Sequence, residues 1–197
     1  GQYVTRAGVG VGVPKAGAPG AHAFVDKMKA SPHLKDFCDA LLAGLASNAQ
    51  SESGFKGNAH GDHKNGYTNV SNPAVKERVE RLSLDGYCSH GFWQMNVCSE
   101  GAGGQRFAAY HNIPLTDKAA LTAAFASEDK QFEVIAKEMR DLFGDDVTKC
   151  SQTAEWYGQQ IAEKYERCRH CKRGDTSWVE RGNTAAGIYN TITGELS

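Results

Sequence analysis

The segment between Leu34 and Leu45 constrains the fold most, because its apolar side chains recur at spacings of three and four residues. These side chains are Leu34, Phe37, Cys38, Leu41, Leu42 and Leu45. The spacing is the period of one buried face of an α-helix. Similar periodic stretches recur along the chain, whereas few β-rich runs occur. The sequence therefore predicts a mostly α fold with a small irregular or β element between helices.

The helical pattern divides the chain into short segments separated by turn residues. The segments predicted to be helices are 22–30, 33–52, 74–82, 103–111, 116–126, 128–143, 153–168 and 181–193. Gly54 and Gly144 are placed to end the second and the sixth of these helices. Residues 56–73 are rich in Gly, Asn and His, which is typical of a loop. Residues 85–104 combine Gly, aromatic residues and Cys, and predict a short hairpin or a set of turns.

The first 20 residues differ in composition from the rest. They hold six Gly and two Pro with little to bury, which is typical of a flexible leader or linker. From Ala21 onward the chain has amphipathic character. We therefore expect a leader at 1–20 and one folded domain at 21–197, the size of an ordinary single domain.

Charge and hydropathy exclude two classes of partner. The chain has 22 Lys and Arg against 23 Asp and Glu, a formal net charge of −1. Binding to nucleic acid through phosphate neutralisation is therefore not expected. The longest stretch without a charged residue, Gly86 to Ser99, is too short and too polar to span a bilayer. We expect no membrane span, and any polymeric substrate must be bound by local contacts.

Six cysteines permit up to three disulfides. Cys88 and Cys98 flank the segment G-F-W-Q-M-N, and a disulfide between them would fix that turn. Cys150 could then pair with Cys168 or Cys171, leaving Cys38 for the other. Disulfides of this kind occur in proteins of oxidising compartments.

Zinc binding is the alternative use of some of these side chains. Cys168 and Cys171 form a C-x-x-C pair, and His60, His63 and His90 are also potential ligands. A structural zinc site needs four ligands, and one C-x-x-C pair without a matching second pair is half a site. We therefore favour disulfides, and expect no cofactor and no metal.

Glu52 is the strongest candidate for a catalytic residue. It lies at the C-terminal end of the predicted apolar helix, directly before Ser53-Gly54. Partial burial and the negative end of the helix dipole both favour the protonated form of a carboxyl group there, as a general acid requires. The alternative is a solvated glutamate at a helix end.

Residues 89–96 have the composition of a carbohydrate-binding turn. Aromatic rings can stack on sugar faces, and amides can bond to hydroxyl and N-acetyl groups. The candidate substrate-binding residues here are Ser89, Phe92, Trp93, Gln94 and Asn96. The alternative interpretation of this segment is a core aromatic cluster.

Together, the segments E-S-G-F-K-G-N-A at 52–59 and G-F-W-Q-M-N at 91–96 resemble the E-S-G-F-x-x-N-A and G-L/I-x-Q motifs of the lysozyme-like superfamily. The phage tail lysozymes are the most similar group. Residues 104–110 are similar to their G-x-R-x-A-L segment, and residues 154–167 to their late E-x-W … Y-E-R-P helix. The resemblance covers about residues 34–192.

This resemblance implies a lysozyme-like helical fold with a cleft lined in part by the small irregular or β element. It further implies cleavage of the β-1,4 bond between N-acetylmuramic acid and N-acetylglucosamine in peptidoglycan. Glu52 corresponds to the proton donor and Gln94 to a residue of the cleft. Tyr189, in A-A-G-I-Y-N, is similar to a Tyr-Asn segment that lines the cleft in lytic transglycosylases.

A second carboxylate would decide the type of reaction. Asp85 lies six residues before the Gly of G-F-W-Q, the offset at which goose-type lysozymes place a water-positioning Asp. Asp62 is the second choice. The alternatives are a turn at Asp85-Gly86 and ordinary loop polarity at Asp62. With a water-positioning base, water is the nucleophile and the reaction is a hydrolysis. Without such a base, a hydroxyl group of the substrate is the nucleophile, as in lytic transglycosylases.

We expect a muramidase module of a larger phage virion or tail protein, which acts at the bacterial cell wall. The alternative functions are those of a lytic transglycosylase and of a catalytically inactive sugar-binding domain. A zinc-dependent wall peptidase is disfavoured because the sequence has no H-E-x-x-H motif.

Overall fold

The structure of the chain is a computed structural model, which describes residues 17–63 and 71–194. Its contacts divide the chain into two compact units. Unit 1 combines the residues up to Phe55 with those from Ile135 onward, and unit 2 comprises Lys56–Val134. The chain thus passes between units after Phe55 and again within helix α7 (Glu128–Phe143). The fold is mostly helical with a small antiparallel sheet, as the sequence predicts.

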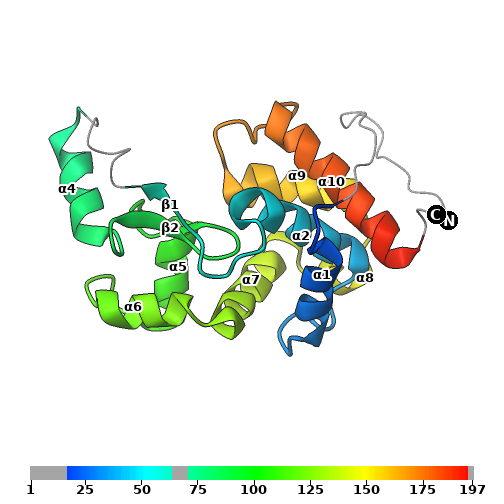
Figure 1. Ribbon diagram of the computed structural model, residues 1–197, viewed down its shortest axis with the longest axis horizontal. Coiled ribbons are helices and arrows are strands. Elements are labelled where there is room, and N and C mark those ends of the chain that lie inside the picture. The colour runs from blue at the N-terminus through cyan, green and yellow to red at the C-terminus, as the bar shows by residue number, and fades with distance from the viewer. Residues whose placement is uncertain (1–16, 64–70, 195–197) are drawn as a thin grey trace. The chain divides into compact units, whose positions relative to one another are not determined.

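Unit 1 is helical, and helix α2 is at its centre. Its elements are α1 (Ala21–Ala30), α2 (Asp39–Ser53), the second half of α7, α8 (Asp146–Lys149), α9 (Ala154–Gln160), the π-helix η1 (Ile161–Glu166) and α10 (Thr176–Thr193). Helices α2, α9 and α10 pack against one another (Figure 1). Every α2 residue from Ala40 to Ala49 is buried. A helix whose side chains are mostly apolar on every side must be enclosed by neighbouring elements in this way.

Two glycines allow these three helices to approach closely. A Cβ atom on Gly44 of α2 would lie 2.9 Å from the Gly158 nitrogen of α9. A Cβ atom on Gly158 would lie 2.7 Å from the Arg181 carbonyl oxygen of α10. Backbone atoms cannot move aside as side chains can, so both positions require glycine at this helix spacing. The close packing fixes α2 relative to α9 and α10.

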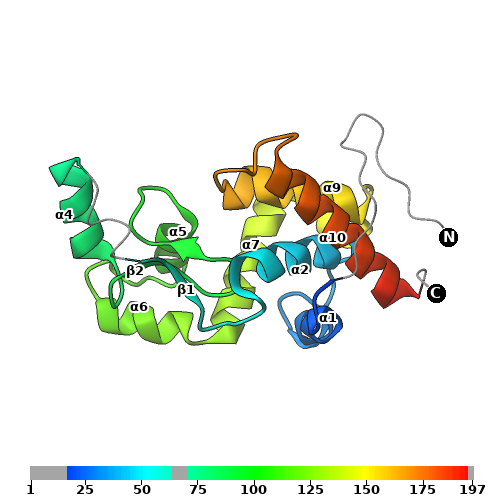
Figure 2. The ribbon, with the colours of Figure 1, turned by 45° about the horizontal axis from the view of Figure 1, so that its top comes forward.

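Unit 2 contains the sheet. Strands β1 (His60–His63), β2 (Tyr87–His90) and β3 (Met95–Asn96) pair antiparallel in that order. The helices of this unit are α4 (Pro73–Leu82), α5 (Gly103–Tyr110), α6 (Lys118–Phe125) and the first half of α7. Figure 2 shows α5 beside the sheet, and α5 contacts β3. The antiparallel pair of β2 and β3 lies within residues 85–104 and confirms the hairpin predicted there.

Several boundaries differ from the predicted ones. Helix α2 begins at Asp39, six residues later than the predicted start, because the Cys38 backbone is extended and its N–H donates to the Val147 carbonyl at 2.9 Å. Strand β1 lies within the predicted loop 56–73, where pairing with β2 determines the conformation. Helix α6 begins at Lys118, two residues later than the predicted start, and its N-cap is Asp117, whose side chain accepts from the Ala120 N–H.

The predicted leader falls mostly outside the described residues, which begin at 17. Its last residues contact helix α2: the Ala18 N–H donates to Gln50 Oε1 at 2.9 Å. The first helix begins at Ala21, one residue before the predicted start. Among the residues that the structure describes, no helix is long and apolar enough to cross a membrane.

The six cysteines form three disulfides. Cys88–Cys98 agrees with the prediction. The predicted partners of Cys150 are wrong, because Cys150 pairs with Cys38 and Cys168 pairs with Cys171. Cys168 and Cys171 lie in one turn with their Cα atoms 5.0 Å apart, within reach of a local bond. Both sulfur atoms of this C-x-x-C pair are joined in the disulfide, so the pair offers no thiolate ligand for the alternative, zinc, in this structure.

Candidate active site

Glu52 lies in the last turn of α2, one residue before the helix ends. Gly54 terminates the helix in the left-handed conformation, with φ 60°, and its N–H donates to the Gln50 carbonyl. The Glu52 side chain is 17% exposed. It is therefore neither a solvated helix-end glutamate nor a core residue, and part of its carboxylate remains accessible.

Arg181 of α10 holds this carboxylate in place. Its Nη2 lies 3.3 Å from Glu52 Oε2, and its Nη1 donates to Asn48 Oδ1 at 2.9 Å. Asn48 in turn donates from Nδ2 to the carbonyl groups of Gly44 and Gly158. The Arg181 side chain is only 7% exposed, so its charge is largely removed from water. A buried guanidinium needs a carboxylate partner, and this need fixes the orientation of Glu52.

Glu166, the last residue of η1, provides a second carboxyl group that sequence reasoning missed. It is in hydrogen-bond contact with Glu52. Burial raises the pKa of Glu166 well above its ordinary value; the charge of Glu52 and the hydrogen bond to it raise the pKa further, and Arg181 opposes them. A signal was present in the sequence: Glu155, Gln159, Ala162 and Glu166 follow the helical period, and the first three are buried.

Glu155 on α9 is a further buried carboxyl group in unit 1. It is 1% exposed, and burial raises its pKa to about 7. A hydrogen bond from Gln159, at 3.3 Å, lowers the pKa but only in part offsets the effect of burial. Its folded-state pKa thus exceeds the ordinary value of 4.5. The stability that protonated Glu155 contributes is complete below that value and is lost as the pH rises through about 7.

We therefore expect Glu155→Gln to stabilise the protein at alkaline pH and not at acid pH. Relative to wild type, its free energy of unfolding should increase by up to about 3 kcal/mol between about pH 4 and pH 8. Urea unfolding of both proteins at the two pH values measures this difference. A difference independent of pH would contradict the assignment.

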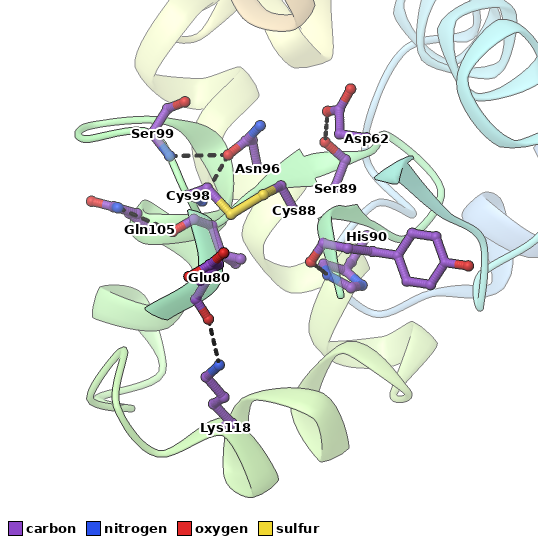
Figure 3. Close-up of a disulfide and its surroundings, with 12 residues drawn as sticks. Asp62, Glu80, Cys88, Ser89, His90, Asn96, Cys98, Ser99, Gln105 and Lys118 are labelled. Carbon is purple, nitrogen blue, oxygen red and sulfur yellow. Dashed lines mark hydrogen bonds between the residues drawn. A yellow bond between two sulfur atoms is a disulfide. The ribbon is translucent and has the colours of Figure 1, made fainter. Parts of the chain in front are cut away.

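Three of the predicted residues of unit 2, Asp62, Ser89 and Asn96, lie on the strands of the sheet (Figure 3). Ser89 of β2 is buried and donates its hydroxyl to the Asp62 carboxylate on β1. Asn96 of β3 accepts at Oδ1 from the N–H groups of Cys98 and Ser99. Asp62 and Ser89 are thus brought together, whereas Asn96 orders the turn that carries the Cys88–Cys98 disulfide.

Gln94 fixes the turn between β2 and β3. Its Nε2 donates to the carbonyl groups of Ala59 and Gly91, at 3.2 and 3.0 Å. Its backbone has φ 50°, and Asp62 and Asp85 also have positive φ, at 53° and 50°. Strained backbone of this kind often occurs at functional sites, although Asp adopts it more readily than Gln.

Phe92 and Trp93, which the sequence predicts to bind the substrate, lie in the core of unit 2. They are 0% and 1% exposed and pack against Phe132 within unit 2, with ring centroids 5.4 and 6.0 Å from its ring. Rings this deeply buried are not available to stack on a sugar. The core aromatic cluster, the alternative interpretation, describes both residues.

Asp85 occupies a tight turn next to a small pocket. Asp85 and Gly86, with φ 50° and 85°, connect Leu84 and Tyr87, which exchange both backbone hydrogen bonds. This is the geometry of a two-residue hairpin turn with positive φ at both central positions, for which Asp-Gly is a favoured sequence. The turn interpretation therefore explains the backbone, and the exposed carboxylate remains available for chemistry.

The pocket of unit 2 has a volume of about 190 Å³ and is lined in part by His60, Asp85, His90 and Phe125. His60 stacks on Tyr87 at 3.8 Å, and His90 Nε2 lies 2.8 Å from the Tyr87 carbonyl oxygen. Burial lowers the pKa of His90, and nearby His60 lowers it further. The hydrogen bond to the Tyr87 carbonyl raises the pKa but does not offset burial. The volume is below the roughly 300 Å³ of small ligand sites, so the pocket can accept only part of a ligand.

The predicted site residues thus fall in both units. Glu52 and Tyr189, which lies on α10 and is partly exposed, belong to unit 1. Asp62, Asp85 and the residues of 89–96 belong to unit 2. Comparison of the chain with models of known protein families and with curated proteins gave no match in either case.

Proposed function

We propose that this protein is a peptidoglycan glycosidase of lysozyme-like fold, a muramidase in which Glu52 is the proton donor. The observation that carries the proposal is the state of Glu52: a helix-end carboxylate, 17% exposed, held by a buried arginine and in contact with a second carboxyl group. General acid catalysis of glycoside cleavage needs a carboxyl group that is partly desolvated and fixed in position. The motifs at 52–59 and 91–96 supply the resemblance on which the substrate class rests.

The substrate of the proposed enzyme is the glycan of peptidoglycan, cut between N-acetylmuramic acid and N-acetylglucosamine. Glu52 protonates the glycosidic oxygen while the bond to the anomeric carbon breaks. Three disulfides suit an enzyme that acts in an oxidising compartment, outside the cytosol. Delivery to the wall as part of a phage tail or virion protein is part of the proposal and rests on the resemblance alone.

Mass spectrometry of the fragments released from purified peptidoglycan tests the class of reaction. The proposal predicts fragments that end in a reducing N-acetylmuramic acid. Fragments with a 1,6-anhydro end would instead identify a lytic transglycosylase. Binding to the wall without any release of fragments would identify a sugar-binding domain and contradict the proposal.

The second carboxylate is tested by Asp85→Asn. Asn-Gly is as favourable as Asp-Gly in this turn, so we expect the free energy of unfolding to change by less than about 0.5 kcal/mol. If Asp85 positions the attacking water, fragment release should fall by at least about 100-fold. Asp62→Asn, assayed in parallel, tests the second choice. Near-full activity in both variants would contradict the two-carboxylate hypothesis and leave Glu52 as the single acid.

A further inference from the structure

A partly buried cluster in unit 1 contains two carboxyl groups and one cation. Glu52 comes from α2, Glu166 from η1 and Arg181 from α10, and these elements pack against one another. Glu166 Oε1 is buried and accepts no hydrogen bond from the residues that the structure describes. Two ionised carboxylates in contact would repel each other and leave the cluster with one uncompensated negative charge. One proton between them removes the repulsion and balances the charge of Arg181.

We propose that Glu166 is the positioning residue of this site, and that it shares one proton with Glu52 so that the pair acts as a single acid. This inference rests on the proposed function of Glu52. It assigns a role to a carboxyl group with a buried oxygen atom, Oε1, on a π-helix. π-Helices are rare, and many of those known lie at functional sites. The segment ends at Arg167, whose backbone is left-handed and whose N–H donates to the Ala162 carbonyl.

Glu166 acts through Glu52 and not directly on the substrate. In inverting glycosidases the two carboxyl groups lie about 6.5–9.5 Å apart to accommodate a water molecule, and in retaining enzymes about 5–5.5 Å. Glu52 and Glu166 are in direct hydrogen-bond contact, which leaves no room for water or a sugar carbon between them. Glu166 is therefore neither the base nor the nucleophile of the reaction.

The proton balance of the proposed step is complete. The shared proton moves along the hydrogen bond to Glu52, which transfers it to the glycosidic oxygen as the bond to the anomeric carbon breaks. Both carboxylates are then ionised beside Arg181. Water provides the hydroxyl group for the anomeric carbon, and its remaining proton returns to the pair through solvent.

The surroundings of Glu166 support one retained proton. From the three helices packed against η1, the ionisable groups that act on it are Glu52 of α2 and Arg181 of α10; among the described residues of α9 none does so. Burial raises the pKa of Glu166 and the Glu52 carboxylate raises it further, whereas Arg181 lowers it. These surroundings therefore favour the protonated form of the Glu166 carboxyl group.

The first test is thermal unfolding of wild type and Glu166→Gln as a function of pH, which requires no activity. The folded-state pKa of Glu166 lies above its ordinary value of 4.5, so wild type loses stability as the pH rises from there. Glu166→Gln keeps the shape of the side chain without the titration. We expect its melting temperature to rise relative to wild type with increasing pH. Parallel curves for the two proteins would overturn the proposal.

The second test is the pH profile of fragment release from peptidoglycan. We expect the alkaline limb of kcat/KM to move to lower pH by at least about one unit in Glu166→Gln, and Glu166→Asp to restore part of it. Glu163→Gln, the same change on the same π-helix, should match wild type in both tests. An equal loss at every pH in Glu166→Gln would contradict the shared proton. If wild type releases no fragments, the proposed function fails, while the unfolding curves still decide whether the proton is shared.

Discussion

Glu52→Gln is expected to abolish release of fragments from peptidoglycan, with a loss of about 10²–10⁴-fold or more in kcat. The amide retains an oxygen that can accept from Arg181, so the side chain should remain in place. It has no proton that it can transfer to the glycosidic oxygen. Binding to the wall should persist, because the variant changes the acid and not the remaining contacts. Dye release from labelled walls, measured alongside a wall-binding assay, checks both expectations.

Asp39→Asn is the matched control for this variant. Asp39 lies at the opposite end of the same helix and pairs at the surface with Lys29 at 2.8 Å. An exposed pair of this kind contributes at most about 1 kcal/mol, so the control should retain full activity. Equal activity of Glu52→Gln and Asp39→Asn would remove Glu52 from the mechanism.

Removal of the Cys38–Cys150 disulfide should have the largest effect on stability. The bond joins residues 112 positions apart in the sequence. In the chain-entropy account, a loop of about this length stabilises the folded state by about 5 kcal/mol, because the cross-link restricts the unfolded chain. The bond also holds the start of α2 beside α8, where the Cys38 N–H donates to Val147. We expect Cys38→Ala/Cys150→Ala to lower the free energy of unfolding by this amount, measured with urea.

The disulfide between Cys168 and Cys171 provides an internal comparison. Its cysteines are three positions apart, so the same account gives a cost of about 2 kcal/mol for its removal. The two double variants should therefore differ clearly in urea midpoint. A larger loss for the short loop would show that local strain or packing, and not loop length, determines the contribution of these bonds.

The helical part of the fold could be predicted well because its signals are local. The three-and-four spacing in α2, the Gly54 terminus and the Asp-Gly turn each depend on near neighbours in the sequence. Strand β1 could not be found this way, since its short His- and Gly-containing segment is a strand only through pairing with β2. The cysteine pairs illustrate the same limit: Cys88–Cys98 is close in sequence, whereas Cys38–Cys150 depends on the tertiary fold.

The candidate site was predictable to the same extent. Glu52 stands out from its position at the end of an apolar helix, but its partners come from segments more than 100 residues away. Arg181 looks like an ordinary exposed cation in the sequence, and its burial follows only from the packing of α10 on α2. Phe92 and Trp93 have the right chemistry for a sugar site, yet the core of unit 2 uses both rings. Residue type indicates possible chemistry, and packing decides which side chains are available for it.

The most direct measurement of the central claim is mass spectrometry of muropeptides from purified peptidoglycan incubated with equal amounts of folded wild type and Glu52→Gln. The account predicts that wild type releases glycan fragments with N-acetylmuramic acid at the cleaved end, and that Glu52→Gln releases essentially none. Release of the same fragments by both proteins would contradict the role of Glu52, and no release by wild type would contradict the proposed enzyme.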